Sequence, residues 1–158
     1  MDIIAFLFCL LTLPISSLTY KILIYQAVPA PSHIHFSGKL TDVLVDAGHV
    51  VDKLIIEWNP YVKSNGTTKA TRIKRFSLSK PSPWLSMPHI TDPFKHTFYY
   101  PFGKEQRVFQ NTLEEFCDAI VSDKSILEWI KQGEYDAAMT NAHDACGFGL
   151  FYLAGIKS

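Results

Sequence analysis

One stretch, residues 20–51, constrains the fold of this chain more than any other part of the sequence. It reads YKILIYQAVPAPSHIHFSGKLTDVLVDAGHVV. Its first six residues are rich in β-branched and aromatic side chains, as in a buried strand, and the loop AVPAP follows them. An apolar pattern of helical period then runs to Gly48, and a second strand-like run opens at Val50. The stretch therefore predicts one strand–helix–strand unit.

The helix within this unit has an apolar stripe, with residues spaced so that one face can lie on a sheet. The residues of the stripe are Phe36, Leu40, Val43, Leu44 and Ala47, and the charged residues expected to face water are Lys39, Asp42 and Asp46. We expect the helix to begin at Ser32 and to close at Gly48 in a left-handed conformation. His33 then lies in the first turn, at the edge of the sheet where open α/β folds bind ligands.

Residues 1–19, MDIIAFLFCLLTLPISSLT, are interpreted as a secretory signal peptide. The apolar run from Ile3 to Leu13 is about half as long as a bilayer span, and Pro14 and small residues follow it. Asp2 stands where signals usually carry a positive charge, and the alternative is a buried first strand. We expect the signal over residues 1–19 and one domain, large enough to bury a core, over residues 20–158.

Net charge and three short features bear on partners and compartment. The formal net charge of zero argues against nucleic acid or an anionic membrane surface as the main partner. No stretch beyond residue 19 is long and apolar enough to cross a bilayer. In a lumenal chain Asn65-Gly66-Thr67 is a glycosylation acceptor, and Cys117 and Cys146 either pair or stay as two buried thiols.

The rest of the chain alternates strand-like and helix-like segments. Further strands are predicted at Val50–Trp58, Arg72–Leu78 and Tyr135–Thr140, and further helices at Gln106–Val121, at Asp123–Gln132 and in the closing segment up to Gly155. Ser125 and Glu128 have the spacing of a capping box, and residues 141–146 form the loop after the last strand. This alternation predicts an α/β fold with a parallel, Rossmann-like sheet.

Residues 79–103 differ in composition from the segments on either side, because prolines and large aromatic residues alternate along them. Prolines at this density interrupt regular structure, yet so many aromatic side chains are unusual in a linker. The segment either lines an apolar pocket or packs its own rings onto the domain.

The sequence holds few residues with an obvious chemical role. It lacks G-x-G-x-x-G after the first strand, a P-loop, paired Cys-x-x-Cys and H-E-x-x-H, so we expect neither a metal nor a cofactor. His33 remains as a candidate general base, because a helix N-terminus disfavours the protonated imidazole. The alternatives are a merely polar His33, or His35 as the base. A basic cluster of Lys69, Arg72, Lys74 and Arg75 is interpreted as a solvated strand face rather than an anion site.

Four pieces of the chain together resemble the amino-terminal part of UDP-glucuronosyltransferases. They are Ser32-His33, the helix end at Gly48-His49, SDKSILEWI and YDAAMTNAHDACGFGLFYLAGI. The resemblance covers nearly all of the predicted mature chain. It implies one half of a GT-B arrangement, in which the first Rossmann-like domain takes the acceptor and the second takes the UDP-sugar. It also implies lumenal endoplasmic reticulum enzymes, anchored by a carboxyl-terminal helix, that transfer glucuronic acid or another hexose to small lipophilic acceptors.

The resemblance also implies roles for individual residues. His33 matches the base that takes the acceptor's proton as UDP departs, and Asn141 falls where the family has the carboxylate that orients this base. Asp144, three residues further on, could substitute for that carboxylate. The residues implied in acceptor binding are Trp84, Phe94 and Phe98.

Two hypotheses follow for the activity. The 158 residues contain no counterpart of the UDP-binding half, so the UDP-sugar is a co-substrate that we expect this polypeptide not to bind by itself. The first hypothesis is an acceptor-side domain of a glucuronosyltransferase that needs a donor domain. The second is a non-catalytic lumenal binding or regulatory module that pairs with full-length relatives. The resemblance also implies a hetero- or homo-oligomer with family members. Membrane attachment would require the carboxyl-terminal helix or an uncleaved signal.

Overall fold

The computed structural model describes residues 18–78, 102–142 and 144–156. Residues 1–17 of the predicted signal peptide and residues 79–101 of the aromatic segment lie outside these ranges, so the structure does not bear on them. Within the described ranges, no helix combines the length and the apolar character that a bilayer span requires.

Four parallel strands form the central sheet, which confirms the predicted Rossmann-like α/β fold. The strands are β1 (Lys21–Ala27), β2 (Val50–Glu57), β3 (Arg72–Ser77) and β4 (Ala137–Met139), in the order β3-β2-β1-β4. The last strand is shorter than predicted, and it pairs with β1 from Ile22 opposite Ala137 to Ile24 opposite Met139. The order of the strands reverses at β1, because β2 and β3 lie on one side of it and β4 on the other.

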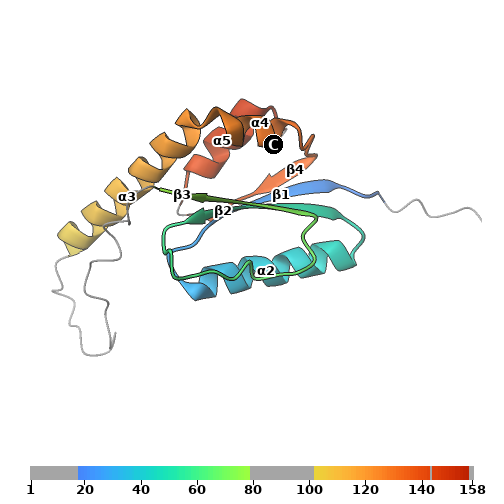
Figure 1. Ribbon diagram of the computed structural model, residues 1–158, viewed down its shortest axis with the longest axis horizontal. Helices are drawn as coiled ribbons and strands as arrows, with labels where there is room; N and C mark the ends of the chain where they lie inside the picture. The colour runs from blue at the N-terminus through green and yellow to red at the C-terminus, as the bar shows by residue number, and fades with distance from the viewer. Residues whose placement is uncertain (1–17, 79–101, 143, 157–158) are drawn as a thin grey trace, which may run out of the picture.

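Helices cover both faces of this sheet (Figure 1). The helix α2 (Pro31–Asp46) covers one face, and α3 (Phe102–Ser122), α4 (Lys124–Lys131) and α5 (Cys146–Ala154) cover the other. A sheet covered on both faces needs apolar side chains on both, which is why its central strands are almost continuously apolar. On β2, Leu54 and Ile56 pack towards α3, α4 and α5, whereas Val51 and Ile55 belong to the core beneath α2.

The buried stripe of α2 differs from the one predicted. Leu40 and Leu44 are partly buried, as expected, but Phe36 is 70% exposed and Val43 is 65% exposed. The buried residues of this helix are Ile34, Ser37, Gly38 and Thr41. Small residues are buried there because the loop between β2 and β3 lies directly on the helix: a Cβ at Gly38 would come within 2.0 Å of a backbone oxygen of Gly66.

The predicted start of α2 at Ser32 and the predicted capping box of α4 are wrong, whereas the start of α4 near Asp123 and two predicted helix ends are confirmed. Helix α2 has Ala30 as its N-cap and Pro31 as its first residue, a common position for proline, so Ser32 already lies inside the first turn. Helix α4 is capped by Asp123, whose carboxylate accepts a hydrogen bond from the Ser125 N–H at 2.9 Å, rather than by a capping box. The predicted terminators Gly48 and Gly155 adopt φ values of 91° and 77°.

Cys117 and Cys146 form a disulfide bond, with their Cα atoms 5.5 Å apart. The bond joins the C-terminal half of α3 to the first residue of α5. Of the two alternatives that the sequence left open, the structure therefore shows the paired one.

A buried lysine connects β2 to α2 and to the loop between β2 and β3. The side chain of Lys53 is fully buried, and its Nζ donates to the Ser37 Oγ at 3.1 Å and to the Asn65 carbonyl oxygen at 2.9 Å. Burial lowers the pKa of Lys53 to about 8, although the nearby carboxylate of Asp42 acts in the opposite direction.

Removing the disulfide should lower the stability of the fold. The bond closes a loop between residues 29 apart, and disulfides of this span stabilise proteins by about 2–4 kcal/mol. We expect the double variant Cys117→Ala/Cys146→Ala to lose about that much free energy of unfolding, measured by urea denaturation. An unchanged urea midpoint would show that the bond does not stabilise the folded chain.

The buried Lys53 should make stability depend on pH. Between pH 7.5 and 9.5 the unfolded chain, with the ordinary lysine pKa of 10.5, binds more protons than the folded chain. The free energy of unfolding should therefore rise with pH over this window, by about 2 kcal/mol. Denaturant titrations should show this rise in the wild type and not in Lys53→Met; equal slopes in both would contradict the burial of a titrating Lys53.

Candidate active site

A shallow hollow lies at the edge of the sheet where the order of the strands reverses. It has a volume of about 350 Å³ and is lined by Ser32, His33, Phe36, Asn141 and Ala142. The first three residues follow β1 and the last two follow β4, so both sets leave the carboxyl ends of neighbouring parallel strands. Ligands of open α/β sheets bind at such a reversal point. The fold thus brings together two parts of the chain that lie more than 100 residues apart.

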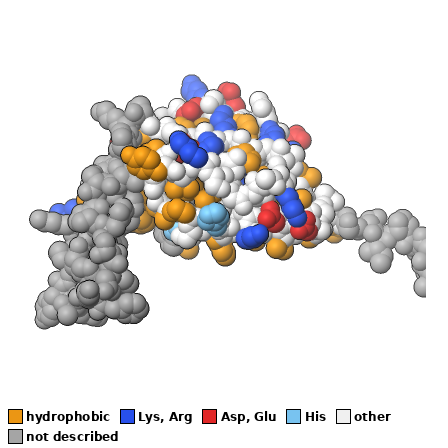
Figure 2. Space-filling model, turned by 60° about the horizontal axis from the view of Figure 1, so that its bottom comes forward, with side chains coloured by type: hydrophobic (Ala, Val, Ile, Leu, Met, Phe, Trp, Pro, Cys, Tyr) orange, Lys and Arg blue, Asp and Glu red, His pale blue; other side chains and the backbone are white. Residues whose placement is uncertain are grey.

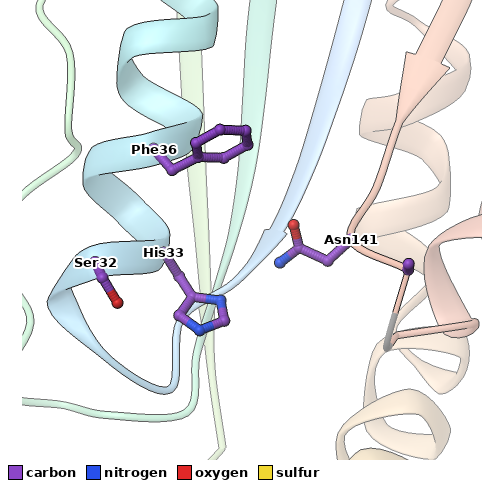
Figure 3. Close-up of a pocket in the computed structure, with 5 residues that line it drawn as sticks. Ser32, His33, Phe36 and Asn141 are labelled. Atoms are coloured by element: carbon purple, nitrogen blue, oxygen red, sulfur yellow. The ribbon is translucent and has the colours of Figure 1, made fainter.

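His33 is the third residue of α2, and its side chain is half-buried. Its backbone N–H donates to the Ala30 carbonyl oxygen at 3.2 Å, which fixes the first turn of the helix. In Figure 3 the imidazole ring points into the space between α2 and the loop after β4. The ring therefore occupies the place that the sequence predicted, beside the N-terminus of a helix and the carboxyl end of β1.

Phe36 is a candidate binding residue that the sequence analysis missed, because the helical pattern predicted a core position for it. The pattern places it in the core, but it is 70% exposed and lines the hollow one turn after His33. Its spacing of three residues from His33 puts both side chains on one face of α2, and this spacing is the signal in the sequence that could have found it. Figure 2 shows hydrophobic side chains gathered beside a histidine on the α2 side of the molecule. The hollow thus offers an imidazole next to an apolar wall.

Asn141 faces His33 from the opposite side of the hollow. It lies two residues after β4, and Figure 3 shows its side chain directed towards α2. Its amide carries both a donor and an acceptor but no charge. It can therefore orient an imidazole by a hydrogen bond, but it cannot balance a positive charge on the ring.

Asp144 holds the turn that carries Asn141, and it is not among the residues that line the hollow. Its carboxylate is buried and accepts hydrogen bonds from the Tyr25 hydroxyl at 2.9 Å and from the Cys146 N–H at 3.0 Å. Its own N–H donates to the Asn141 carbonyl oxygen at 3.1 Å. Burial, followed by the charge and hydrogen bond of Asp144, raises the pKa of Tyr25. These contacts show that Asp144 supports this turn, and its role as a substitute for the family's carboxylate stays a prediction.

The other candidate residues lie elsewhere. His35 is exposed and is not part of the hollow's lining, whereas Trp84, Phe94 and Phe98 lie outside the described residues. In the basic cluster, Lys69, Arg72 and Arg75 pair with Asp46, Asp52 and Glu57. These carboxylates neutralise much of the cluster's charge, in agreement with the interpretation that it is not an anion site. Among the described residues no group of three or more His, Cys, Asp or Glu could hold a metal ion.

Two glycines of α5 provide a matched test of how the turn after β4 is held. A Cβ at Gly147 would come within 2.5 Å of the Thr140 Oγ1, next to Asn141, whereas a Cβ at Gly149 would meet nothing within 4 Å. Gly147→Ala should therefore cost about 1–3 kcal/mol of folding free energy and shift the NMR signals of the Asn141 side chain. Gly149→Ala should be neutral or slightly stabilising. Equal effects of the two substitutions would contradict the close packing of Gly147 on Thr140.

Comparison with known proteins finds that this chain is similar to glycosyltransferases. Two proteins of Caenorhabditis elegans described as UDP-glucuronosyltransferases are 25% and 24% identical to this chain, over 145 and 147 residues. These matches cover 89% and 88% of this chain and 27% of each relative. The 2-hydroxyacylsphingosine 1-beta-galactosyltransferase of Mus musculus is 22% identical over 149 residues, which are 87% of this chain and 25% of that enzyme.

No family model matches the chain, and no solved structure matches it significantly. The sequence relatives nevertheless agree with the resemblance inferred from residues 32–33 and 48–49 and from the segments around α4 and α5. The parallel sheet agrees with one part of a GT-B glycosyltransferase domain. The chain is therefore a relative of the UDP-glucuronosyltransferases, and it spans about a quarter of their length.

Proposed function

We propose that this chain forms the acceptor-binding part of a glycosyltransferase that moves a hexose, such as glucuronic acid, from a UDP-sugar to a small lipophilic acceptor. The observation that carries the proposal is the hollow in which His33 and the apolar ring of Phe36 face Asn141. A hydroxyl compound with an apolar body matches this combination, because its ring or chain can contact Phe36 while its hydroxyl reaches the imidazole. The relatives named above are described as transferases for glucuronic acid and galactose, so the sugar itself stays a proposal.

In the proposed reaction His33 acts as the general base. The imidazole takes the proton of the acceptor's hydroxyl as its oxygen attacks the anomeric carbon of the sugar. The bond between that carbon and UDP breaks, its electron pair leaves with UDP, and the configuration inverts. Asn141 would accept a hydrogen bond from the second ring nitrogen and so fix the tautomer. Because the amide is neutral, it leaves the imidazolium charge unbalanced, and we expect slower transfer than with a carboxylate at this position.

The size of the hollow supports the proposal that this chain binds the acceptor and a second domain binds the UDP-sugar. About 350 Å³ is near the lower end of ligand pockets, which hold roughly 300–1,000 Å³. This volume suits a small acceptor but not an acceptor together with a UDP-sugar. The UDP-sugar would therefore be held by a second domain, from a longer polypeptide or from another chain. Trp84, Phe94 and Phe98 are proposed to extend the acceptor's apolar contacts.

The proposed location is the lumen of the endoplasmic reticulum. The Cys117–Cys146 disulfide supports it, because such bonds persist in oxidising compartments. The apolar residues near the start of the chain and the acceptor tripeptide at Asn65 agree with this location. Attachment to the membrane, through an uncleaved signal or a carboxyl-terminal helix, is part of the same proposal.

One observation favours a second candidate function, a non-catalytic lumenal module that pairs with longer relatives. Asn141 stands where the family resemblance implies a carboxylate, and an amide cannot stabilise the charged imidazole. In serine proteases, replacing the aspartate that orients the catalytic histidine by asparagine lowers kcat by about 10⁴. A module of this kind would still bind a lipophilic acceptor in the hollow but would transfer no sugar.

A chimera that joins this chain to the donor domain of a relative tests the catalytic proposal. We expect His33→Ala to lower kcat at least about 100-fold, the scale of general-base catalysis, and Asn141→Asp to raise it. His35→Ala is the matched control, because this exposed histidine lies two residues away on the same helix. Initial rates of glucuronide formation from a lipophilic phenol provide the measurement.

The outcomes separate the two candidate functions. Sugar transfer that depends on His33 but not on His35 supports the catalytic function. An inactive chimera that still binds the phenol, and stays inactive as Asn141→Asp, supports the binding module. Rates that are unchanged in both His33→Ala and Asn141→Asp would exclude the proposed pair.

A further inference from the structure

The loop between β2 and β3 carries the only Asn-X-Ser/Thr tripeptide of the sequence, Asn65-Gly66-Thr67. We call residues 62–68 the sequon loop. It lies against α2, on the face of the sheet opposite α3, α4 and α5 (Figure 1). Gly66 and Thr67 contact α2 itself, whereas Asn65 is held by side chains of β2 and β3.

Asn65 is held at two points, one on its side chain and one on its backbone. Its side-chain Oδ1 accepts a hydrogen bond from the Arg75 Nη1 at 2.8 Å, and its carbonyl oxygen accepts one from the buried Lys53 Nζ at 2.9 Å. Arg75 also donates to the carbonyl oxygens of Val62 and Ser64, at 2.8 and 3.1 Å. One guanidinium group on β3 therefore fixes the first half of the sequon loop.

The middle residue is pressed against the helix backbone. Gly66 adopts a φ of 75°, and a Cβ built on it would come within 2.1 Å of the Ile34 carbonyl oxygen. A Cβ on Gly38 would come within 2.0 Å of the Gly66 oxygen. Because two backbones approach this closely, no third polypeptide can surround Gly66 while the loop is docked.

The hydroxyl of the tripeptide is engaged as well. The Thr67 Oγ1 donates a hydrogen bond to Asp42 on α2, and it accepts one from the Lys69 N–H at 2.9 Å. The hydroxyl residue is part of the acceptor tripeptide, so the transferring enzyme needs access to this hydroxyl and to the backbone beside it. In the folded chain, both are already bound within the protein.

We propose that Asn65 carries an N-linked glycan and that it can receive this glycan only before the sequon loop docks on α2. In the transfer step, the Asn65 Nδ2 forms a bond to C1 of the first sugar and loses a proton. The bond from C1 to the lipid-linked pyrophosphate breaks, and its electron pair leaves with the pyrophosphate. Asn65 is therefore glycosylated only if the sugar is transferred before the sequon loop folds onto α2.

The folded structure accommodates the product of this reaction. Arg75 contacts the amide oxygen of Asn65, so the glycan-bearing nitrogen is not the atom used in that bond. The half-exposed Asn65 also lines a hollow of about 430 Å³, together with Asp42, Ser64, Gly66, Thr67 and Thr68. The first sugar has space there beside hydroxyl groups, so a glycan added early does not prevent later docking of the loop.

The timing can be tested on one protein in two states. Chain made without glycosylation is folded with its disulfide formed, and half of it is then unfolded and reduced. Both samples receive solubilised oligosaccharyltransferase and its lipid-linked oligosaccharide, and the glycan at Asn65 is measured by mass spectrometry. We expect initial rates at least about 10-fold higher for the unfolded sample, and complete modification when the chain is translated into microsomes; Thr67→Ala should abolish both.

A matched pair of variants tests the docking itself. Gly38→Ala should push the sequon loop from α2 and make the folded chain an acceptor, whereas Gly149→Ala, whose Cβ would meet nothing within 4 Å, should leave it protected. The wild-type comparison remains decisive if Gly38→Ala does not fold. Equal rates for folded and unfolded wild type would overturn the timing, and an absence of glycan in microsomes and in the unfolded sample would overturn the site.

Discussion

The parallel pairing of β4 with β1 holds the two sides of the candidate site together. Only three residue pairs join these strands, yet they set the chain after β4 beside the chain after β1. The segment after β4 carries Asn141, and the segment after β1 carries His33. Asp144 reinforces the pairing from the other side of the turn, because it accepts a hydrogen bond from Tyr25 on β1. The disulfide at Cys146 then ties the same turn to α3.

Helix α2 serves two purposes on different faces. Near its N-terminus His33 and Phe36 project into the hollow, whereas Gly38 and Thr41 are buried on a different side of the helix. The small residues permit contact with the sequon loop, and the buried Lys53 bridges that loop to Ser37. The position of His33 therefore depends on packing that lies outside the hollow, because the same helix must satisfy both contacts.

Local periodicity predicted most of the elements, since it reports whether a segment is a strand or a helix. The strand–helix–strand unit, the parallel sheet and the ends at Gly48 and Gly155 followed from it. It failed for the buried face of α2, where larger apolar side chains were expected inside and Gly38 was found, because the approach of a distant loop decides that face. The meeting of His33 and Asn141 likewise depends on a non-local strand pair, so periodicity did not predict it, and it was expected only from the family resemblance.

The proposed function requires that the hollow between His33 and Asn141 binds the hydroxyl end of a lipophilic molecule. NMR titration of the chain with 4-propylphenol measures this binding, with propylbenzene as the control that lacks the hydroxyl. We expect the His33 ring and the Asn141 side-chain amide to shift along one binding curve with the phenol, and the His33 ring to shift less with the hydrocarbon. Phenol binding that leaves both residues unchanged, or no binding at all, would show that the hollow is not an acceptor site.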